Sequence, residues 1–360
     1  MKLRIGLVTI SLIVSVLIGL SLSLMTNCND NSESTKDNSL LIGLSMDTLK
    51  EERWQKDRDF FVAAAEKLGA EVIVQSANGD DARQFAQCEN MLTRGVDILV
   101  VIPHNGKAAA SIVEAAHKSG VKVIAYDRII NDSDLDLYIS FDNQRVGELQ
   151  AQYLVEHAPK GNYILIGGAP TDFNSLLLRK GQMKVIEPHI ESQDIVIIAD
   201  QWAKDWQPIE ALKHVENALT RVNNDVQVVV TSNDGTAGGA IQALAEQRLT
   251  GKVLVSGQDA DLAACQRILA GTQSMTVYKP IKPLAEKAAE VALKMIRNEL
   301  ISGINASINN GKIEVPSILL EPIQVDTSNL VQTVIADGFH KLEDVYKNVP
   351  TALWPDLESN

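Results

Sequence analysis

Polar side chains follow the apolar runs of this 360-residue chain at the points where those runs end. In chain order they are Asp127, Arg128, Asp172, Asn174, Asn233, Asp234, Gln258, Asp259 and Lys279. Carboxylates and amide oxygens accept hydrogen bonds, whereas guanidinium, ammonium and amide N–H groups donate them. Such a mixed set suits a small neutral molecule crowded with hydroxyl groups, because each hydroxyl both donates and accepts.

Tryptophan occurs near the same strand ends in a chain with only 4% aromatic residues. Trp54 lies in the charged stretch EERWQKDRDF, and Trp202 and Trp206 follow the run DIVIIADQ. An indole face suits the C–H side of a sugar ring, so Trp54 and Trp206 favour a free sugar as the ligand. Trp54 also precedes Phe61 by seven residues, which fits the buried stripe of a helix equally well. Trp202 is interpreted as structural.

Five of these polar residues also have a structural interpretation. Asp127, Asn233 and Asp259 belong to residue types that commonly cap a helix after a strand. Arg128 and Lys279 suit solvated surface positions. The prediction of a binding site therefore depends on the recurrence of polar residues at strand ends, where open parallel sheets bind their ligands.

Motifs of common catalytic and nucleotide-binding sites are missing from the sequence. Neither GxSxG nor HExxH occurs, and no Cys or His cluster has metal-ligand spacing. No GxGxxG or GxxxxGK[ST] follows a strand-like run. His104 stands near a strand end without an evident acid or nucleophile to work with. The sequence therefore predicts a binding protein with no enzymatic activity, no cofactor and no metal.

The net charge of −13 is spread along the chain. A protein that binds a phosphate backbone needs clustered Lys and Arg, so nucleic acid is not an expected partner. The content of 45% apolar and 22% charged residues is typical of a globular protein. The length suffices for two domains with separate cores.

From residue 40 onward, short apolar runs alternate with amphipathic helical segments. Runs rich in β-branched residues predict strands at 40–45, 71–77, 96–103, 121–128, 137–141, 162–169, 194–201, 226–233 and 252–259. Because the runs are apolar at nearly every position, both faces of each strand are expected to be covered. The predicted fold class is α/β, with two doubly wound parallel-sheet lobes. Segments 274–280, 281–299 and 318–325 are expected to pass between the lobes, and 302–311 to form a surface loop.

The first 28 residues have the layout of an export signal, in which a basic start precedes an apolar run. Cys28 follows this run and is the candidate lipidated cysteine of a lipoprotein. An ordinary cleaved signal and an uncleaved membrane anchor remain open, since the run is long enough to span a bilayer. In each case residues 29–39 form a polar tether, and the rest of the chain lies outside the cytoplasmic membrane. Cys88 and Cys265 are expected to be buried free thiols.

Several long stretches are distinctive, namely ERWQKDRD (52–59), AYDRIIND (125–132), YISFDN (138–143), TAGGAIQAL (236–244), SGQDADLA (256–263) and GTQSMTVYKPI (271–281). With them, the chain resembles the periplasmic D-xylose-binding proteins of bacterial ABC sugar importers, within the wider ribose- and galactose-binding group. The resemblance extends over about residues 42–341. It implies a type I periplasmic-binding-protein-like fold whose two lobes are joined by three hinge crossings, and it implies no catalysis.

The resemblance also implies a division of the chain and a set of site residues. The N-terminal lobe is expected at 40–143 and 281–310, the C-terminal lobe at 144–280 and 311–345, and a tail at 346–360. The sugar-binding residues implied are Arg53, Asp127, Arg128, Asn174, Asn233, Asp259 and Lys279 as hydrogen-bonding groups, with Trp54 and Trp206 against the two ring faces. Trp54 is then expected to be exposed in the open, empty protein. Phe173 departs from the family pattern, and it could crowd the mouth of the site or shift the ligand preference.

The expected function is high-affinity capture of a monosaccharide by closure of the lobes, followed by delivery to an ABC permease and its ATPase complex. D-xylose is the first candidate, with another pentose or glucose as alternatives, and the protein is expected to act as a monomer. A different possibility is a receptor subunit that presents the bound sugar to a membrane sensor. A repressor of the same fold would need a helix-turn-helix where the export segment lies. An extracellular enzyme would need the missing catalytic groups.

Overall fold

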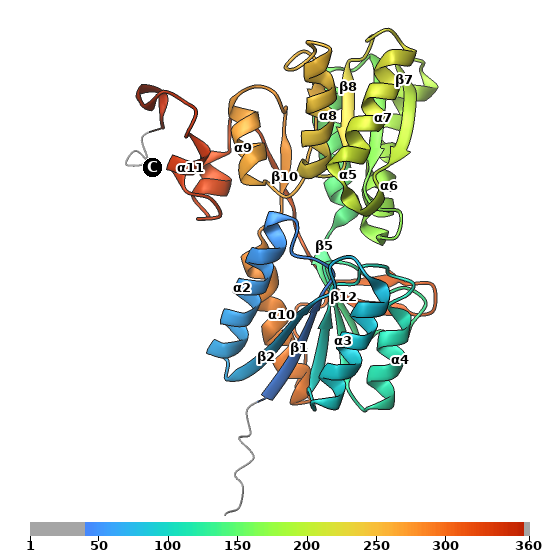
Figure 1. Cartoon of the computed structure of the whole chain (residues 1–360), viewed down its shortest axis with the longest axis vertical. Helices are drawn as coiled ribbons and strands as arrows, with labels where there is room; N and C mark the ends of the chain where they lie inside the picture. The colour runs from blue at the N-terminus through green and yellow to red at the C-terminus, as the bar shows by residue number, and fades with distance from the viewer. Residues whose placement is uncertain (1–39, 356–360) are drawn as a thin grey trace, which may run out of the picture. The chain divides into compact units, whose positions relative to one another are not determined.

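The computed structural model describes residues 40–355 (Figure 1). The predicted export signal, Cys28 and the tether at 29–39 lie outside the described residues. Among the helices of the described part, none is both long and apolar enough to cross a bilayer.

The first sheet has seven strands in the order β11-β12-β5-β4-β3-β1-β2. Its parallel strands are β1 (Leu40–Met46), β2 (Ala70–Ser76), β3 (Ile98–Val101), β4 (Lys122–Tyr126), β5 (Leu137–Phe141) and β12 (Glu314–Leu320). The edge strand β11 (Ala306–Asn309) runs antiparallel to β12. The segment predicted as a loop at 302–311 therefore contains a strand, whose residues are half-buried or exposed and gave little apolar signal.

Helices cover both faces of this sheet. One face packs against α2 (Glu52–Lys67) and α10 (Ile281–Ile296), the other against α3 (Asp81–Thr93) and α4 (Ala110–Lys118). In β3, Ile98 and Val100 join the first cluster, while the intervening Leu99 joins the second, and each is fully buried. Burial on both faces explains why the strand is apolar at every position. This sheet and its helices form the first lobe.

The second lobe is built around a four-stranded parallel sheet in the order β7-β6-β8-β9. Its strands are β6 (Gly161–Gly167), β7 (Ile195–Trp202), β8 (Val228–Thr231) and β9 (Leu254–Val255). One face packs against α5 (Asn143–His157) and α6 (Phe173–Glu191), the other against α7 (Pro208–Arg221) and α8 (Asp234–Glu246) (Figure 1). The prediction of two doubly wound α/β lobes is confirmed.

The remaining elements are short and pack mostly around one small cluster. They are a 3₁₀ turn at Lys204–Trp206, α9 (Leu262–Leu269), β10 (Thr276–Tyr278), β13 (Ile323–Val325), a π turn at Val331–Ile335, α11 (Leu342–Val345) and a 3₁₀ turn at Thr351–Leu353. β10 and β13 pair with each other as an antiparallel ribbon. Tyr346 and Trp354 of the C-terminal segment pack against the cluster that contains α9, β10 and β13.

Within residues 40–355 the chain passes between the lobes from β5 to α5, from β10 to α10 and from β12 to β13. The third crossing corrects the predicted boundary at 310/311, because Ser317–Leu320 pair in register with Tyr138–Phe141 of β5. The segment at 318–325, expected to pass between the lobes, does so, and it is divided at Pro322, which has no backbone N–H to donate to a sheet. Its first part belongs to the first lobe and its second part to the β10–β13 ribbon.

Candidate ligand-binding site

A cavity with about 350 Å³ of empty space is lined by residues of both lobes. All nine residues predicted from the sequence line it, namely Arg53, Trp54, Asp127, Arg128, Asn174, Trp206, Asn233, Asp259 and Lys279. Each of them is at most 8% exposed. We call this space the inner cavity.

Four further residues complete its wall: Glu51, Asn143, Asp172 and Gln258. Asp172 and Gln258 are among the strand-end residues noted in the sequence. Asn143 was missed although it stands two residues after β5, where the same rule applies. Glu51 was missed because it precedes α2 as an ordinary-looking acid, with no strand directly before it.

Arg53 connects three carboxylates inside the cavity wall. Its Nη2 donates to Asp127 Oδ2 (2.8 Å), its Nε to Asp57 Oδ2 (3.1 Å) and its Nη1 to Asp259 Oδ1 (3.3 Å). Burial by itself lowers the pKa of Arg53, but the three carboxylates outweigh this effect and hold the pKa well above its usual value. The guanidinium is therefore a fixed positive charge in the site.

Lys279, at the second crossing, supplies another cation. Its Nζ lies 3.1 Å from Asp259 Oδ1 and 4.0 Å from Asp127 Oδ2. Burial tends to raise the pKa of Asp127, but Arg53, Lys279 and Arg128 together lower it. Asp127 is thus held ionised as a hydrogen-bond acceptor.

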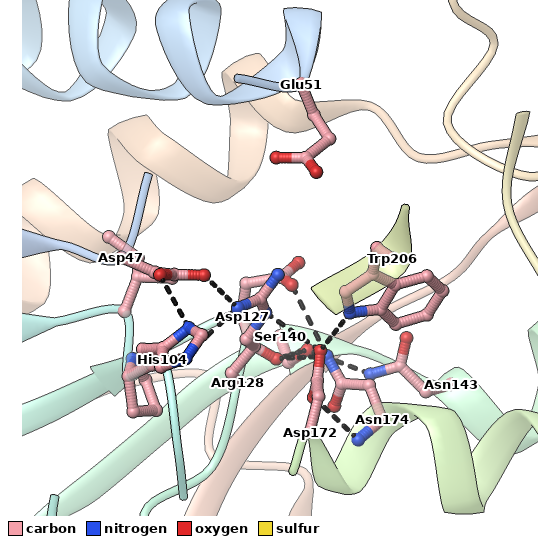
Figure 2. A network of polar contacts seen from close by, with 12 residues as sticks. Asp47, Glu51, His104, Asp127, Arg128, Ser140, Asn143, Asp172, Asn174 and Trp206 are labelled. Carbon is pink, nitrogen blue, oxygen red and sulfur yellow. Dashed lines mark hydrogen bonds and ion pairs between the residues drawn. The ribbon is translucent and has the colours of Figure 1, made fainter. Parts of the chain in front are cut away.

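Arg128 joins the two lobes directly. Its Nη1 donates to Asp47 Oδ2 (2.7 Å) in the first lobe, and its Nε lies 2.8 Å from Asp172 Oδ2 in the second. Figure 2 shows this chain of contacts continuing to Trp206, whose Nε1 donates to the same Asp172 oxygen (3.2 Å). At its other end, Asp47 Oδ1 pairs with His104 Nδ1 at 2.9 Å. His104 therefore has an acid partner that its sequence context did not reveal.

The backbone at Asp127 is left-handed, with φ of 60°. Its carbonyl oxygen accepts hydrogen bonds from Ser140 Oγ (2.7 Å), Tyr138 Oη (2.9 Å) and Asn174 Nδ2 (2.9 Å). Asp259 is left-handed as well, with φ of 96°. Non-glycine residues adopt this conformation at a cost and cluster at functional sites. Neither aspartate is a helix cap, so the capping interpretation is wrong for both.

Asn233, in contrast, is a helix cap. Its Oδ1 accepts from Thr236 N (2.9 Å) at the start of α8, and Thr236 Oγ1 accepts from Asn233 N (3.3 Å). Because only the oxygen is used, Asn233 Nδ2 has no hydrogen-bond acceptor among the described residues and remains a donor on the cavity wall. Asn233 is therefore both the N-cap of α8 and a residue of the cavity wall.

The two cavity tryptophans are held differently. Trp54 is 3% exposed and packs in the same core cluster as Phe61, so it belongs to the buried stripe of α2 while it also lines the cavity. The Arg53 guanidinium lies 4.3 Å from the centre of its ring. Trp206 packs against Gly168, where a Cβ atom would overlap the ring. Trp202 packs against the neighbouring Gly167 in the same way and does not line the cavity, in agreement with a structural role.

Three buried acceptors of the wall receive no hydrogen bond from the described part of the chain. They are Asn143 Oδ1, Gln258 Oε1 and Glu51 Oε2. Buried polar atoms are normally paired, so such atoms at a cavity indicate a ligand that donates hydrogen bonds. The wall also contains four carboxylates and three cations, which nearly balance. The arrangement suits an uncharged ligand with several hydroxyl groups.

Other residues singled out in the sequence lie elsewhere. Phe173 does not line the inner cavity; it is half-buried and packs against the core of the first lobe from its position on α6. Cys88 and Cys265 are buried free thiols, as predicted, and burial raises the pKa of Cys88 to about 11. Across residues 40–355, no group of three or more His, Cys, Asp or Glu side chains is placed to hold a metal ion.

Comparisons with known proteins agree with this geometry. The D-xylose-binding periplasmic protein of Haemophilus influenzae is 56% identical over 315 residues, which cover 88% of this chain and 95% of that protein. The protein of the same name from Escherichia coli K12 is 55% identical over 318 residues, 88% of this chain and 94% of its own length.

A solved structure and a family model extend the likeness. The carbohydrate transporter solute binding protein from Chloroflexus aurantiacus, in complex with D-glucose, superposes with a TM-score of 0.79 at 32% identity, covering 84% of this chain and 97% of the other. The family model described as a periplasmic binding protein domain matches residues 42–300. The chain belongs to the periplasmic binding protein family, in the group that includes the D-xylose-binding periplasmic proteins.

Proposed function

We propose that this protein captures a monosaccharide, D-xylose in the first place, outside the cytoplasmic membrane and delivers it to an ABC importer. One observation carries the proposal: nine polar and aromatic residues, drawn from both lobes, converge on one cavity with nearly balanced charge. The names of the two bacterial relatives, at 56% and 55% identity, support xylose as the sugar.

Each part of the wall has a role in this proposal. Asp127 and Asp259 accept hydrogen bonds from sugar hydroxyls, while Arg53 and Lys279 donate to them. Arg53 and Lys279 also help to keep Asp127 ionised. Asn233 Nδ2 supplies a further donor. Trp54 and Trp206 contact the apolar faces of the ring.

A second group of wall residues joins the lobes around the sugar. Arg128 and Asn174 bind hydroxyls and also reach across the cleft, through Asp172 and the Asp127 carbonyl respectively. Asn143 Oδ1 and Gln258 Oε1 are the acceptors for the remaining hydroxyl protons. The sugar then favours the closed form, because only there do both lobes contact it.

The partners and location follow from the family and remain part of the proposal. The closed, loaded protein docks on a permease whose ATPase drives release, and no chemical step occurs on the sugar. The protein lies in the periplasm or at the outer surface of the cytoplasmic membrane, where a lipid on Cys28 holds it close to the permease. Metabolic labelling with a radioactive fatty acid tests the anchor: the label is expected in the wild type and absent from Cys28→Ser.

A thermal-shift panel of pentoses and hexoses tests the ligand. Binding to the folded state raises the melting temperature by mass action, so D-xylose is expected to give the largest rise and calorimetry a single site. A larger rise with glucose would replace xylose as the ligand. No rise with any sugar would overturn the proposed function.

A further inference from the structure

A second cavity adjoins the inner cavity. It has about 560 Å³ of empty space and shares Glu51, Arg128 and Trp206 with the inner cavity. The rest of its wall comes from loops of both lobes and includes Thr48, Asn78, His104, Thr171 and Gln207. We call this space the outer chamber. Nothing in the proposed capture of a single sugar ring uses it.

Glu51 stands on the boundary between the two spaces. Figure 2 shows its carboxylate reaching from the start of α2 into the gap between the Asp47–His104 pair and Trp206. Its Oε1 lies 3.1 Å from Lys50 Nζ, whereas Oε2 is buried and accepts no hydrogen bond from the described residues. Glu51 Oε2 can therefore accept a hydrogen bond from a ligand that extends from the inner cavity into the outer chamber.

The cations of the outer chamber already have acidic partners. Asp47 neutralises Arg128 (2.7 Å) and pairs with His104 (2.9 Å). Lys50 lies against Glu51 and donates to the Asp205 carbonyl of the second lobe (3.1 Å). No cation of this chamber is left over for an anionic ligand, so a phosphate or carboxylate would lack a counter-charge.

The uncharged groups of the chamber define what it can bind. Thr48, Asn78 and Gln207 offer hydroxyl and amide groups, which exchange hydrogen bonds with hydroxyls. Trp206, shared by both spaces, offers an apolar ring surface at the junction. The outer chamber thus offers the same kinds of group as the inner cavity, namely hydrogen-bonding side chains and an indole ring.

We propose that the outer chamber is a second sugar subsite, so that the protein also takes a neutral disaccharide with one ring in each space. The proposal rests on the proposed function, because the inner ring must bind as described. The glycosidic oxygen or a neighbouring hydroxyl then passes beside Glu51. The ligand class is a short, uncharged pentose oligosaccharide or glycoside.

Calorimetry with D-xylose and with xylobiose freed of xylose by chromatography tests this subsite on the complete protein. The variant is Gln207→Trp, which fills the outer chamber from a position that does not line the inner cavity. Gln207 precedes α7 and makes no side-chain capping bond, so its replacement removes no cap. Gln207→Ala is the matched control.

The wild type is expected to bind xylobiose within about tenfold of its affinity for xylose. Gln207→Trp is expected to weaken xylobiose binding at least about tenfold with xylose binding unchanged. Gln207→Ala removes one amide partner of the outer ring without filling the chamber, so it is expected to weaken xylobiose binding only about two- to fivefold and to leave xylose binding unchanged. A tenfold change is about 1.4 kcal/mol. Xylose binding without xylobiose binding, or equal weakening of both sugars by the Trp variant, overturns the subsite alone. Failure of the wild type to bind either sugar overturns the proposed function and the subsite with it.

Discussion

Arg53 Nη1 lies 3.3 Å from Asp259 Oδ1, although the two residues are 206 positions apart in the sequence. Arg53 belongs to α2 of the first lobe, and Asp259 follows β9 of the second. Lys279, at a crossing between the lobes, approaches the same oxygen at 3.1 Å. One carboxylate therefore links both lobes and a hinge, and any movement of the lobes changes its surroundings.

Asp259→Ala is expected to weaken sugar binding about ten- to a hundredfold while the protein stays folded. The loss corresponds to ~1.5–3 kcal/mol for a hydrogen bond to a charged group. Titration calorimetry with D-xylose measures the affinity, and circular dichroism the fold. Asp134→Ala is the control, because its carboxylate is mostly exposed and pairs only with Lys312. An Asp259→Ala variant with wild-type affinity would remove Asp259 from the site.

Gly168→Ala is expected to weaken sugar binding, because the added Cβ displaces the Trp206 ring that lines the cavity. Gly167→Ala is a matched control, since its Cβ displaces Trp202 outside the cavity. Both variants should lose stability by about 1–3 kcal/mol through overpacking. Only Gly168→Ala should lose affinity in fluorescence or calorimetric titration; equal affinities in the two variants would contradict a role for Trp206 in binding.

Phe173→Ala is expected to weaken sugar binding without touching the sugar. Phe173 packs from α6 of the second lobe against the core of the first, so its ring stabilises the closed form. A fully buried ring contributes ~1.5–3 kcal/mol, and the half-buried Phe173 contributes about half of that to the closed form. Its loss should reduce the population of the closed form, and with it the apparent affinity for sugar, about fivefold. Leu176→Ala, on the same helix but 45% exposed, should change little.

Small-angle scattering provides a second measurement for this variant. Without sugar, Phe173→Ala should have a larger radius of gyration than the wild type, and saturating sugar should remove the difference. Identical affinity and identical radii would show that Phe173 does not act on closure.

Asp234 is expected to make stability depend on pH between about 4 and 7. Burial raises its pKa from 3.8 to about 7 in the folded protein. Between these values the folded state holds a proton that the unfolded state has lost, so the free energy of unfolding falls as pH rises. The stabilising contribution is fully present below the unfolded pKa and is lost as pH passes about 7.

Asp234→Asn should make this slope shallower, because asparagine does not titrate. Burial and the nearby acids also raise the pKa of Asp261, which still contributes to the pH dependence. The measurement is urea unfolding of both proteins at several pH values between about 4 and 7. The substitution also removes a hydrogen-bond acceptor, which changes the free energy of unfolding by the same amount at every pH. The difference in this free energy between wild type and variant should therefore change steadily with pH only if Asp234 titrates. Parallel curves would show that Asp234 does not titrate in this range. Asp134→Asn, at an exposed position, should give a curve parallel to the wild type.

The location of the site could be predicted because it follows from a rule about sheets. Asp127, Asn174, Asn233 and Asp259 all follow parallel strands, and parallel strands end at the same edge. Their backbone conformations could not be predicted. At Asp127, where φ is left-handed, the carbonyl oxygen accepts hydrogen bonds from Tyr138, Ser140 and Asn174. These side chains come close to it only after the chain folds.

The weaker predictions failed where the local signal was short or ambiguous. β11 has half-buried and exposed residues and pairs only at the sheet edge, so the segment gives no apolar pattern. β12 belongs to the first lobe through pairing with β5, a contact between distant segments that no local pattern encodes. Trp54 fits both of the interpretations that its sequence left open, because it belongs to the core cluster and also lines the cavity.

The return of β12 to the first sheet has a consequence for how the chain is made. During synthesis, the ribosome releases β1–β5 and the four-stranded sheet of the second lobe before β12, which extends the first sheet, has been added. A nascent chain that stops short of Leu320 carries an open edge at β5, where an exposed strand invites pairing with other chains. A C-terminal truncation that removes β12 is thus expected to damage the N-terminal lobe as well, and the two halves of the molecule cannot be separated by a single cut.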